Sequence, residues 1–266
     1  MPELPEVETI ARFLRPELTG REIVSAQLLW QRTVATPSPE QFVEQIVGQK
    51  ILDVSRRAKY LDLQFATYHL FIHLRMSGDL AIKDAACQPE KHDRLVLKLS
   101  DGRQLVFNDT RKFGRVWLTA HPEDVIGGLG PEPFDPAFTS QMFHTRLKER
   151  RRQMKPLLLD QNFLAGLGNI YTDEALHLSG VHPLRVSDTI IDSEANRLYQ
   201  AIQTVLLAGI EHNGASIDWV YRGGNFQNYF RVYGREGQPC PVCGTPIQRI
   251  LVGQRGTHFC STCQVK

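Results

Sequence analysis

Four of the five cysteines lie near the C-terminus of this 266-residue sequence, in two closely spaced pairs. Cys240, Cys243, Cys260 and Cys263 give the spacing C-x2-C-x16-C-x2-C. Each C-x2-C turn presents two thiolates to one ion, and four thiolates complete a tetrahedron that leaves no open position for catalysis. The pattern predicts one structural Zn²⁺ ion, whereas the alternative of two disulfides is disfavoured in a reducing compartment.

The N-terminus offers a second kind of chemistry. The sequence begins Met1-Pro2-Glu3, a start from which the initiator methionine is normally removed, so that Pro2 gains a secondary amine. α-Amino groups have a reference pKa of ~7.7–8, so a useful fraction is neutral near pH 7. Such an amine can attack a sugar C1′ carbon and form an iminium, with Glu3 as general acid or base. Alternatively, this segment simply begins a helix.

Charge is distributed unevenly along the chain. Residues 1–140 have 17 basic and 19 acidic side chains, whereas residues 141–266 have 14 and 10. Segments 141–156 and 222–266 each have six basic side chains and one acidic side chain. Two basic clusters on a nearly neutral protein favour an anionic polymer bound on one side, and a solvated helix face is the equally weighted alternative.

The elements that position these groups begin with a helix. One apolar stripe has the i, i+3, i+4, i+7 spacing of a buried helix face. Its residues are Val7, Ile10, Ala11, Leu14 and Leu18. Pro5 suits the first helical turn, so Pro2 and Glu3 are expected just before the helix.

Short β-like runs follow, with one helix at 39–47 between them, and many short strands argue for a β-sandwich or barrel. The runs are 22–30, 51–56, 60–65, 69–75, 94–100, 104–107 and 115–119. A Gly- and Pro-rich linker at 127–136 ends this region. Beyond it, helices are expected at 138–150, 155–165, 170–179 and 187–213, then an exposed loop at 214–228. Between the cysteine pairs, 247–252 and 257–259 predict a β-hairpin with 253–256 at its tip.

Composition excludes several classes of protein. With 42% hydrophobic residues, the chain can bury a sizeable core, so it is neither disordered nor a disulfide-stapled miniprotein. No run approaches the ~18 apolar residues of a membrane span, and the N-terminus lacks the basic region of a secretory signal. The expectation is a soluble protein of the cytoplasm without membrane association.

Six motifs, in order along the chain, resemble those of bacterial formamidopyrimidine-DNA glycosylases. They are MPELPEVET at 1–9, RAKY at 57–60, HLRMSG at 73–78, NDTRKFG at 108–114, GNIY at 168–171 and QRGTHFC at 254–260. The resemblance implies an α+β, two-domain, monomeric enzyme of the bacterial cytoplasm. An N-terminal β-sandwich flanked by helices would occupy 1–131, a helical helix–two-turn–helix domain 132–231, and a zinc-finger β-hairpin 232–266.

The resemblance also implies the activity. Duplex DNA would bind in the positively charged cleft, and the enzyme would excise 8-oxoguanine and formamidopyrimidines and then cut the abasic site by β,δ-elimination. Pro2 resembles the Schiff-base nucleophile, Glu3 the acid that protonates the opening sugar, and Glu6 a supporting residue. Lys59 resembles a second catalytic proton donor near the phosphates. Arg255 resembles the zinc-finger arginine that grips the phosphates around the lesion and is assigned to the δ-elimination step. Without the motifs, Lys59 is an ordinary strand lysine and Arg255 a solvated one.

Further residues resemble DNA contacts. Met76, Arg111 and Phe113 resemble the wedge that fills the helix when a base is flipped out, which costs a few kcal/mol of stacking and pairing. For Met76 and Phe113 the alternative is core packing. Asn169 resembles a phosphate contact, or else caps a helix, and His92 resembles a DNA contact, or else is a surface histidine.

The position of one further contact is open. Arg150 falls near it, with Arg151 and Arg152 as alternatives. The loop at 214–228 corresponds to the family's variable cover over the flipped base.

Two competing interpretations stay open. Endonuclease VIII-like glycosylases share the nucleophile and prefer oxidised pyrimidines, but Leu4 in place of glycine and the Met76, Arg111, Phe113 set argue against them. A zinc-finger protein that binds or senses damaged DNA without cutting it is the non-enzymatic alternative.

Overall fold

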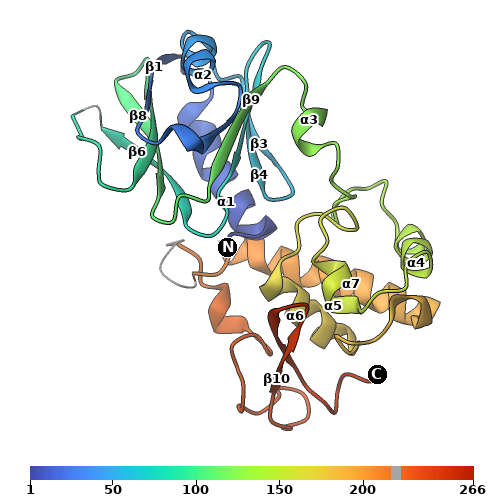
Figure 1. Ribbon diagram of the computed structural model, residues 1–266. Coiled ribbons are helices and arrows are strands. Elements are labelled where there is room, and N and C mark those ends of the chain that lie inside the picture. Colours follow the sequence, from blue (N-terminus) through green and yellow to red (C-terminus); the bar gives the residue numbers. More distant parts are fainter. Residues whose placement is uncertain (85, 217–222) are drawn as a thin grey trace. The chain divides into compact units, whose positions relative to one another are not determined.

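The computed structural model describes residues 1–84, 86–216 and 223–266, which form two compact units (Figure 1). The first, here called the β-sandwich unit, contains residues 1–2, 6–128 and 216. The second, the helical unit, contains residues 3–5, 129–215 and 223–266. The N-terminal segment therefore contributes to both units, since Glu3–Pro5 belong to the helical unit.

Two sheets make up the β-sandwich unit. One has the strand order β1-β7-β8-β6, and the other has the order β2-β9-β5-β4-β3. All neighbouring strands are antiparallel except the pair β2 and β9. The strands are β1 (Ile23–Leu28), β2 (Val34–Thr36), β3 (Asp53–Arg57), β4 (Tyr60–Gln64), β5 (His69–His73), β6 (Gly78–Asp84), β7 (Asp93–Leu99), β8 (Arg103–Asp109) and β9 (Arg115–Thr119).

All seven expected runs contain a strand, and β2 and β6 are additional. β2 has three residues, too few for a visible alternation. β6 begins at a glycine and includes Asp79, Lys83 and Asp84, which obscure its pattern. Between the sheets lies one core, to which α1 (Leu4–Leu18) contributes its expected stripe, at most 6% exposed. α2 (Pro39–Ile46) begins with a capping box of Ser38 and Gln41 and packs beside β1, and α3 (Glu123–Ile126) ends the unit.

The helical unit contains four α-helices and the C-terminal hairpin among its described residues. These elements are α4 (Ser140–Lys148), α5 (Met154–Leu158), α6 (Asn169–Ser179), α7 (Asp192–Glu211), β10 (Gln248–Val252) and β11 (Arg255–Phe259), with short 3-10 turns at η2 (Ser187–Thr189) and η3 (Phe226–Tyr229). The expected helix at 155–165 is wrong beyond Leu158. Beyond Leu158 the Gln161 side chain replaces helical hydrogen bonds. Its amide nitrogen donates to the carbonyls of Leu159 and Leu167, and its amide oxygen accepts the Gly166 N–H.

The expected exposed loop at 214–228 needs correction at its ends. Gly214, Ala215, Gly224 and Phe226 are buried, and the Phe226 ring stacks on Tyr171 with centroids 5.2 Å apart. Residues 217–222, the middle of the expected loop, lie outside the described part of the chain. The aromatic contact explains why the loop packs at Phe226 rather than extending into solvent.

α6 and α7 approach closely at one glycine. A Cβ at Gly209 of α7 would lie 2.5 Å from a ring carbon of Tyr171, which is fully buried in α6. Alanine favours helices by ~1 kcal/mol over glycine, but the ring cannot yield inside a packed core. The contact therefore fixes where α6 lies on α7.

We predict that Gly209→Ala lowers the free energy of unfolding by ~1–3 kcal/mol, because overpacking outweighs helix propensity. Urea denaturation measures the change. Leu207→Ala, at a half-exposed position of the same helix, serves as the control and should change stability far less. A Gly209→Ala protein more stable than wild type would contradict the predicted clash.

Candidate functional site

The Glu3 carboxylate is bound at the N-terminus of α6. Its oxygens accept hydrogen bonds from the backbone N–H groups of Gly168 at 2.6 Å, Ile170 at 2.9 Å and Tyr171 at 3.5 Å. These are unpaired donors of the first helical turn, where the helix dipole also favours negative charge. Glu3 is 2% exposed, and a Cβ at Gly168 would collide with its carboxyl group. The three donors stabilise the carboxylate form of Glu3.

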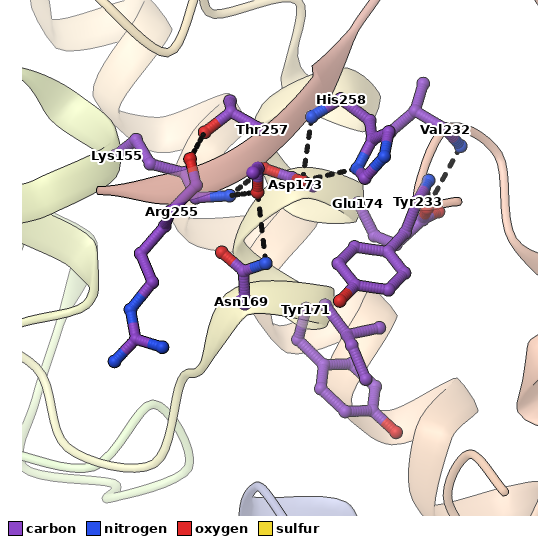
Figure 2. Close-up of polar contacts among 12 residues, drawn as sticks. Lys155, Asn169, Tyr171, Asp173, Glu174, Val232, Tyr233, Arg255, Thr257 and His258 are labelled. Atoms are coloured by element: carbon purple, nitrogen blue, oxygen red, sulfur yellow. Dashed lines mark hydrogen bonds and ion pairs between the residues drawn. The ribbon is translucent and has the colours of Figure 1, made fainter. Parts of the chain in front are cut away.

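Asn169 and Arg255 lie near the same end of α6. The Asn169 amide donates a 3.1 Å hydrogen bond to the carbonyl of Gly256, the residue after Arg255 (Figure 2). The Arg255 side chain is exposed and points away from the other labelled residues, and among the described residues it has no hydrogen bond or ion pair. Arg255 begins β11 rather than lying in the expected tip. The structure thus brings Glu3, Asn169 and Arg255 together and leaves a guanidinium for an anion.

A buried ion pair that the sequence analysis missed supports this end of α6. Lys155 Nζ donates to the Asp173 carboxylate, and both side chains are fully buried (Figure 2). Asp173 also accepts the backbone N–H of His258 at 2.9 Å, so the pair joins α5, α6 and β11. Burial lowers the pKa of the Lys155 ammonium, and the charge of Asp173 opposes that shift. The place of Lys155 in segment 141–156 suggested that it belongs to an exposed basic cluster, but the structure shows that it is buried.

Glu174 is the second buried acid of α6. Its carboxylate accepts the backbone N–H groups of Arg231, Val232 and Tyr233 at 2.8–3.0 Å. Burial raises the pKa of the Glu174 carboxyl, and the three donors oppose that change. The sequence contained one signal of this role: Asp173 and Glu174 lie between the apolar pairs Ile170-Tyr171 and Ala175-Leu176 of a predicted helix, and buried charges require partners.

The four cysteines gather as expected for a metal ion. Their sulfurs all lie within 4.8 Å of one another. The Sγ atoms of Cys240 and Cys263 are 3.8 Å apart, and those of Cys243 and Cys260 are 3.4 Å apart. A tetrahedron with ~2.3 Å Zn–S bonds has edges of ~3.8 Å, whereas a disulfide needs ~2.05 Å. The residues fit one structural Zn²⁺, and the disulfide alternative is wrong. The fifth cysteine, Cys87, is exposed.

In the β-sandwich unit, Lys59 lies in the two-residue turn between β3 and β4 rather than in a strand, and its side chain is only 4% exposed. Its charge acts on His73 of β5. Burial, then the charges of Arg75 and Lys59, lower the pKa of His73 to about 3. The neutral ring accepts the Arg75 N–H at 3.0 Å. A histidine that remains uncharged adds no repulsion beside the lysine.

The proposed wedge residues are exposed. Met76 is 40% and Phe113 48% exposed, so the core-packing alternative is wrong for both. The Arg111 guanidinium lies 5.0 Å from the centre of the Phe113 ring. Beneath them the Asp109 carboxylate accepts the Gly114 N–H at 2.7 Å and the Arg111 N–H at 3.2 Å, and it also accepts the Ser77 hydroxyl. Asp109 thereby joins the segments that carry the three residues, which is a role the sequence analysis missed.

The remaining expected residues of the β-sandwich unit are partly or fully covered. Pro2 is buried, and Glu6 in the first turn of α1 is 2% exposed. His92 is partly exposed, its carbonyl accepts the Asp109 N–H at 2.9 Å, and its ring lies 3.3 Å from the Arg94 guanidinium. His92 therefore adjoins the segment that carries Arg111.

Ion pairs distinguish Arg150 from Arg151 and Arg152, the two alternative positions for this contact. Arg152 pairs with Asp160 at 2.6 Å, and Arg151 lies 3.9 Å from Asp188. Arg150 is exposed, and in the described part of the chain no carboxylate pairs with it. Of the three guanidinium groups, only that of Arg150 has no carboxylate within ion-pair distance among the described residues.

A β-sandwich unit, a helical unit with a carboxylate at a helix N-terminus, and a four-cysteine hairpin define a zinc-containing protein of the helix–two-turn–helix class. Three family profiles agree: the formamidopyrimidine-DNA glycosylase N-terminal domain matches residues 1–116, the H2TH domain 129–220, and the zinc finger found in FPG and IleRS 237–265. The chain belongs to the formamidopyrimidine-DNA glycosylase family.

Relatives and solved structures match over the full length. The formamidopyrimidine-DNA glycosylases of Chloroflexus aggregans and Pelotomaculum thermopropionicum are 47% and 43% identical, with 99% or more of each chain covered. A complex of Lactococcus lactis Fpg (MutM) with DNA containing N7-benzyl-Fapy-dG has a TM-score of 0.94 at 38% identity. A MutM complex with DNA containing carbocyclic 8-oxo-G has a TM-score of 0.93 at 38% identity. Each of these two matches covers 100% of this chain and 100% of the matched chain.

We predict that Asp173→Ala lowers the free energy of unfolding by ~3–5 kcal/mol, because it leaves Lys155 charged and unpaired in the interior. Urea denaturation measures the loss. Asp160→Ala, which breaks the partly exposed pair with Arg152, is the matched control and should cost less than ~1 kcal/mol. Lys155→Met combined with Asp173→Asn should recover part of the loss. Equal effects of the two single variants would contradict the prediction.

Zinc removal should weaken DNA binding, because the free energy of metal binding folds the hairpin that carries Arg255. We expect a chelator, or Cys243→Ser, to reduce the affinity for lesion-containing duplex DNA, measured by fluorescence anisotropy alongside zinc content. Cys87→Ser, which alters the exposed fifth cysteine, is the control and should leave both unchanged. Full affinity in metal-free protein would overturn this role for the zinc.

Proposed function

We propose that this chain excises oxidised purines, 8-oxoguanine and formamidopyrimidines, from duplex DNA and then cleaves the strand at the abasic site. Membership of the formamidopyrimidine-DNA glycosylase family over the whole chain supports the substrate class. The observation that carries the chemistry is the position of Glu3. This residue follows Pro2 in the sequence, and its carboxylate is held at the N-terminus of α6. An acid–base group next to an amine is what a Schiff-base reaction requires.

The proposed reaction begins once Met1 has been removed and the Pro2 nitrogen is an amine. The amine attacks C1′ of the damaged nucleotide, the C1′–base bond breaks, and the base leaves with the bonding electrons. Glu3, held as a carboxylate by three N–H donors, accepts the proton of the amine and returns it to the ring oxygen as the C1′–O4′ bond opens. The iminium between Pro2 and C1′ then allows β,δ-elimination.

The other expected residues receive roles in this proposal. Lys59 supplies a second proton-transfer group, and Glu6 supports the site. Arg255 and Asn169 hold the phosphates around the lesion, because the guanidinium is open and the amide fixes the adjacent hairpin. Met76, Arg111 and Phe113 fill the space of the flipped nucleotide, with Arg111 facing the orphaned base. This use explains why apolar side chains remain exposed at Met76 and Phe113.

Two further DNA contacts and the arrangement of the chain belong to the proposal. His92 and Arg150 contact the backbone of the duplex. The modules are 1–131, 132–231 and 232–266, and the protein acts as a monomer in the bacterial cytoplasm, where chromosomal DNA lies. No helix in the described residues has the length and apolar character needed to cross a membrane.

Borohydride trapping tests the proposed nucleophile. We expect a covalent protein–DNA adduct when borohydride is added during reaction with an 8-oxoguanine:cytosine duplex, and peptide mapping should place it on Pro2. Protein that retains Met1 has an amide at this nitrogen and should not trap, although it binds the duplex. Mass spectrometry distinguishes the two forms.

Matched variants separate the roles in this reaction. Pro2→Gly should lose trapping with binding retained, and Glu3→Gln should bind lesion DNA without excising the base. Duplex binding without any adduct from Met1-free protein would favour a damage-binding protein without enzymatic activity. Thymine glycol duplexes cut faster than 8-oxoguanine duplexes would favour the endonuclease VIII-like alternative.

A further inference from the structure

The last turn of α6 contacts the metal site through a histidine. His177 is 3% exposed, and its Nε2 lies 3.3 Å from the sulfur of Cys240. Its Nδ1 lies 3.3 Å from the Nε of Arg231. The ring therefore bridges a guanidinium and one of the four metal-binding sulfurs. None of these contacts is needed for the reaction proposed above.

The direction of these hydrogen bonds follows from chemistry. A guanidinium carries only donors, so Arg231 donates and His177 Nδ1 must accept. An imidazole whose Nδ1 accepts carries its proton on Nε2, so Nε2 donates to the Cys240 sulfur. Zinc ligands are thiolates, and a thiolate is a good acceptor. The result is a chain of donors that runs from Arg231 through His177 to Cys240.

We propose that His177 is a positioning residue of the zinc site, which stabilises the Cys240 thiolate by hydrogen bonding and thereby slows loss of the metal. Four thiolates around one Zn²⁺ carry a formal charge of −2, which concentrates nucleophilic electron density on sulfur. Hydrogen bonds to ligand atoms orient them and tune the metal site. Cys240 also accepts a 3.5 Å bond from the Val242 N–H, so its sulfur has two donors.

The surrounding contacts hold the donor chain in place. Arg231 is fixed through its own N–H, which donates to Glu174, one turn before His177 on α6. The Arg235 guanidinium donates to the carbonyls of Phe230, Arg231 and Pro239, so it holds the segment that leads to Cys240. His177 is thus tied to the metal-binding segment from both sides.

A second connection joins the same end of α6 to the other cysteine pair. The Gln264 amide donates to the carbonyl of Val181, just after α6, and its oxygen accepts the Cys260 N–H at 2.8 Å. The backbone around both cysteine pairs is therefore tied to α6. Only the His177 route reaches a sulfur directly in the described residues, so the two routes have separable effects.

Zinc release tests this inference. The purified zinc-loaded protein is mixed with the chromogenic chelator 4-(2-pyridylazo)resorcinol, and the rate of metal transfer is followed. We expect His177→Phe, which keeps a ring but removes the donor, to release zinc about 10-fold faster or more. His177→Gln should remain close to wild type, because its amide oxygen can accept from Arg231 while its amide nitrogen donates to Cys240.

Two measurements keep the test decisive if His177→Phe folds poorly. Arg231→Met leaves the histidine in place but frees its tautomer, so release should lie between that of wild type and that of His177→Phe. In Co²⁺-substituted protein, loss of the donor should move the sulfur-to-metal charge-transfer band to lower energy. Equal release rates in all variants, or equally fast release from His177→Phe and His177→Gln, would overturn the proposal.

Discussion

The burial of charged groups along α6 is the constraint on which the helical unit depends. An unpaired charge in a protein interior is costly, so each buried acid of this helix requires a partner. Lys155 pairs with Asp173, and the backbone of 231–233 pairs with Glu174. The unpaired N–H groups at the N-terminus of the helix pair with Glu3. These partners come from distant parts of the sequence, so α6 holds together segments that are far apart along the chain.

This arrangement links stability to the chemistry proposed for the N-terminus. The three backbone N–H groups at the start of α6 find their acceptor in Glu3, and the same three hydrogen bonds stabilise its carboxylate. The ion pair that neutralises Lys155 also holds β11, which begins at Arg255. A catalytic group must be held close to its productive position, and in the role proposed for Glu3 the contacts made during folding would provide that precision.

In the β-sandwich unit the notable constraint is a different one, because two large apolar side chains are exposed to solvent. Met76 and Phe113 gain nothing from burial in this unit, and Asp109 organises their segments through hydrogen bonds instead. Exposed apolar groups are a recognised mark of an interaction surface. The proposed contact with unstacked bases would give these side chains a partner.

The sequence by itself determined the local features. Cysteine spacing indicated the zinc site, and apolar periodicity indicated the α1 stripe and the seven expected strands. The motifs indicated the family. All of these features can be read from residues that are close together in the sequence. It did not indicate where the helix at 155–165 ends, or that Lys155 is buried, or that His177 meets Cys240. The burial of Lys155 and the contact of His177 depend on side chains 18 and 63 positions away, for Asp173 and Cys240 respectively. Only the tertiary structure decides them, because a buried charge or donor takes whichever partner the fold brings within hydrogen-bonding distance.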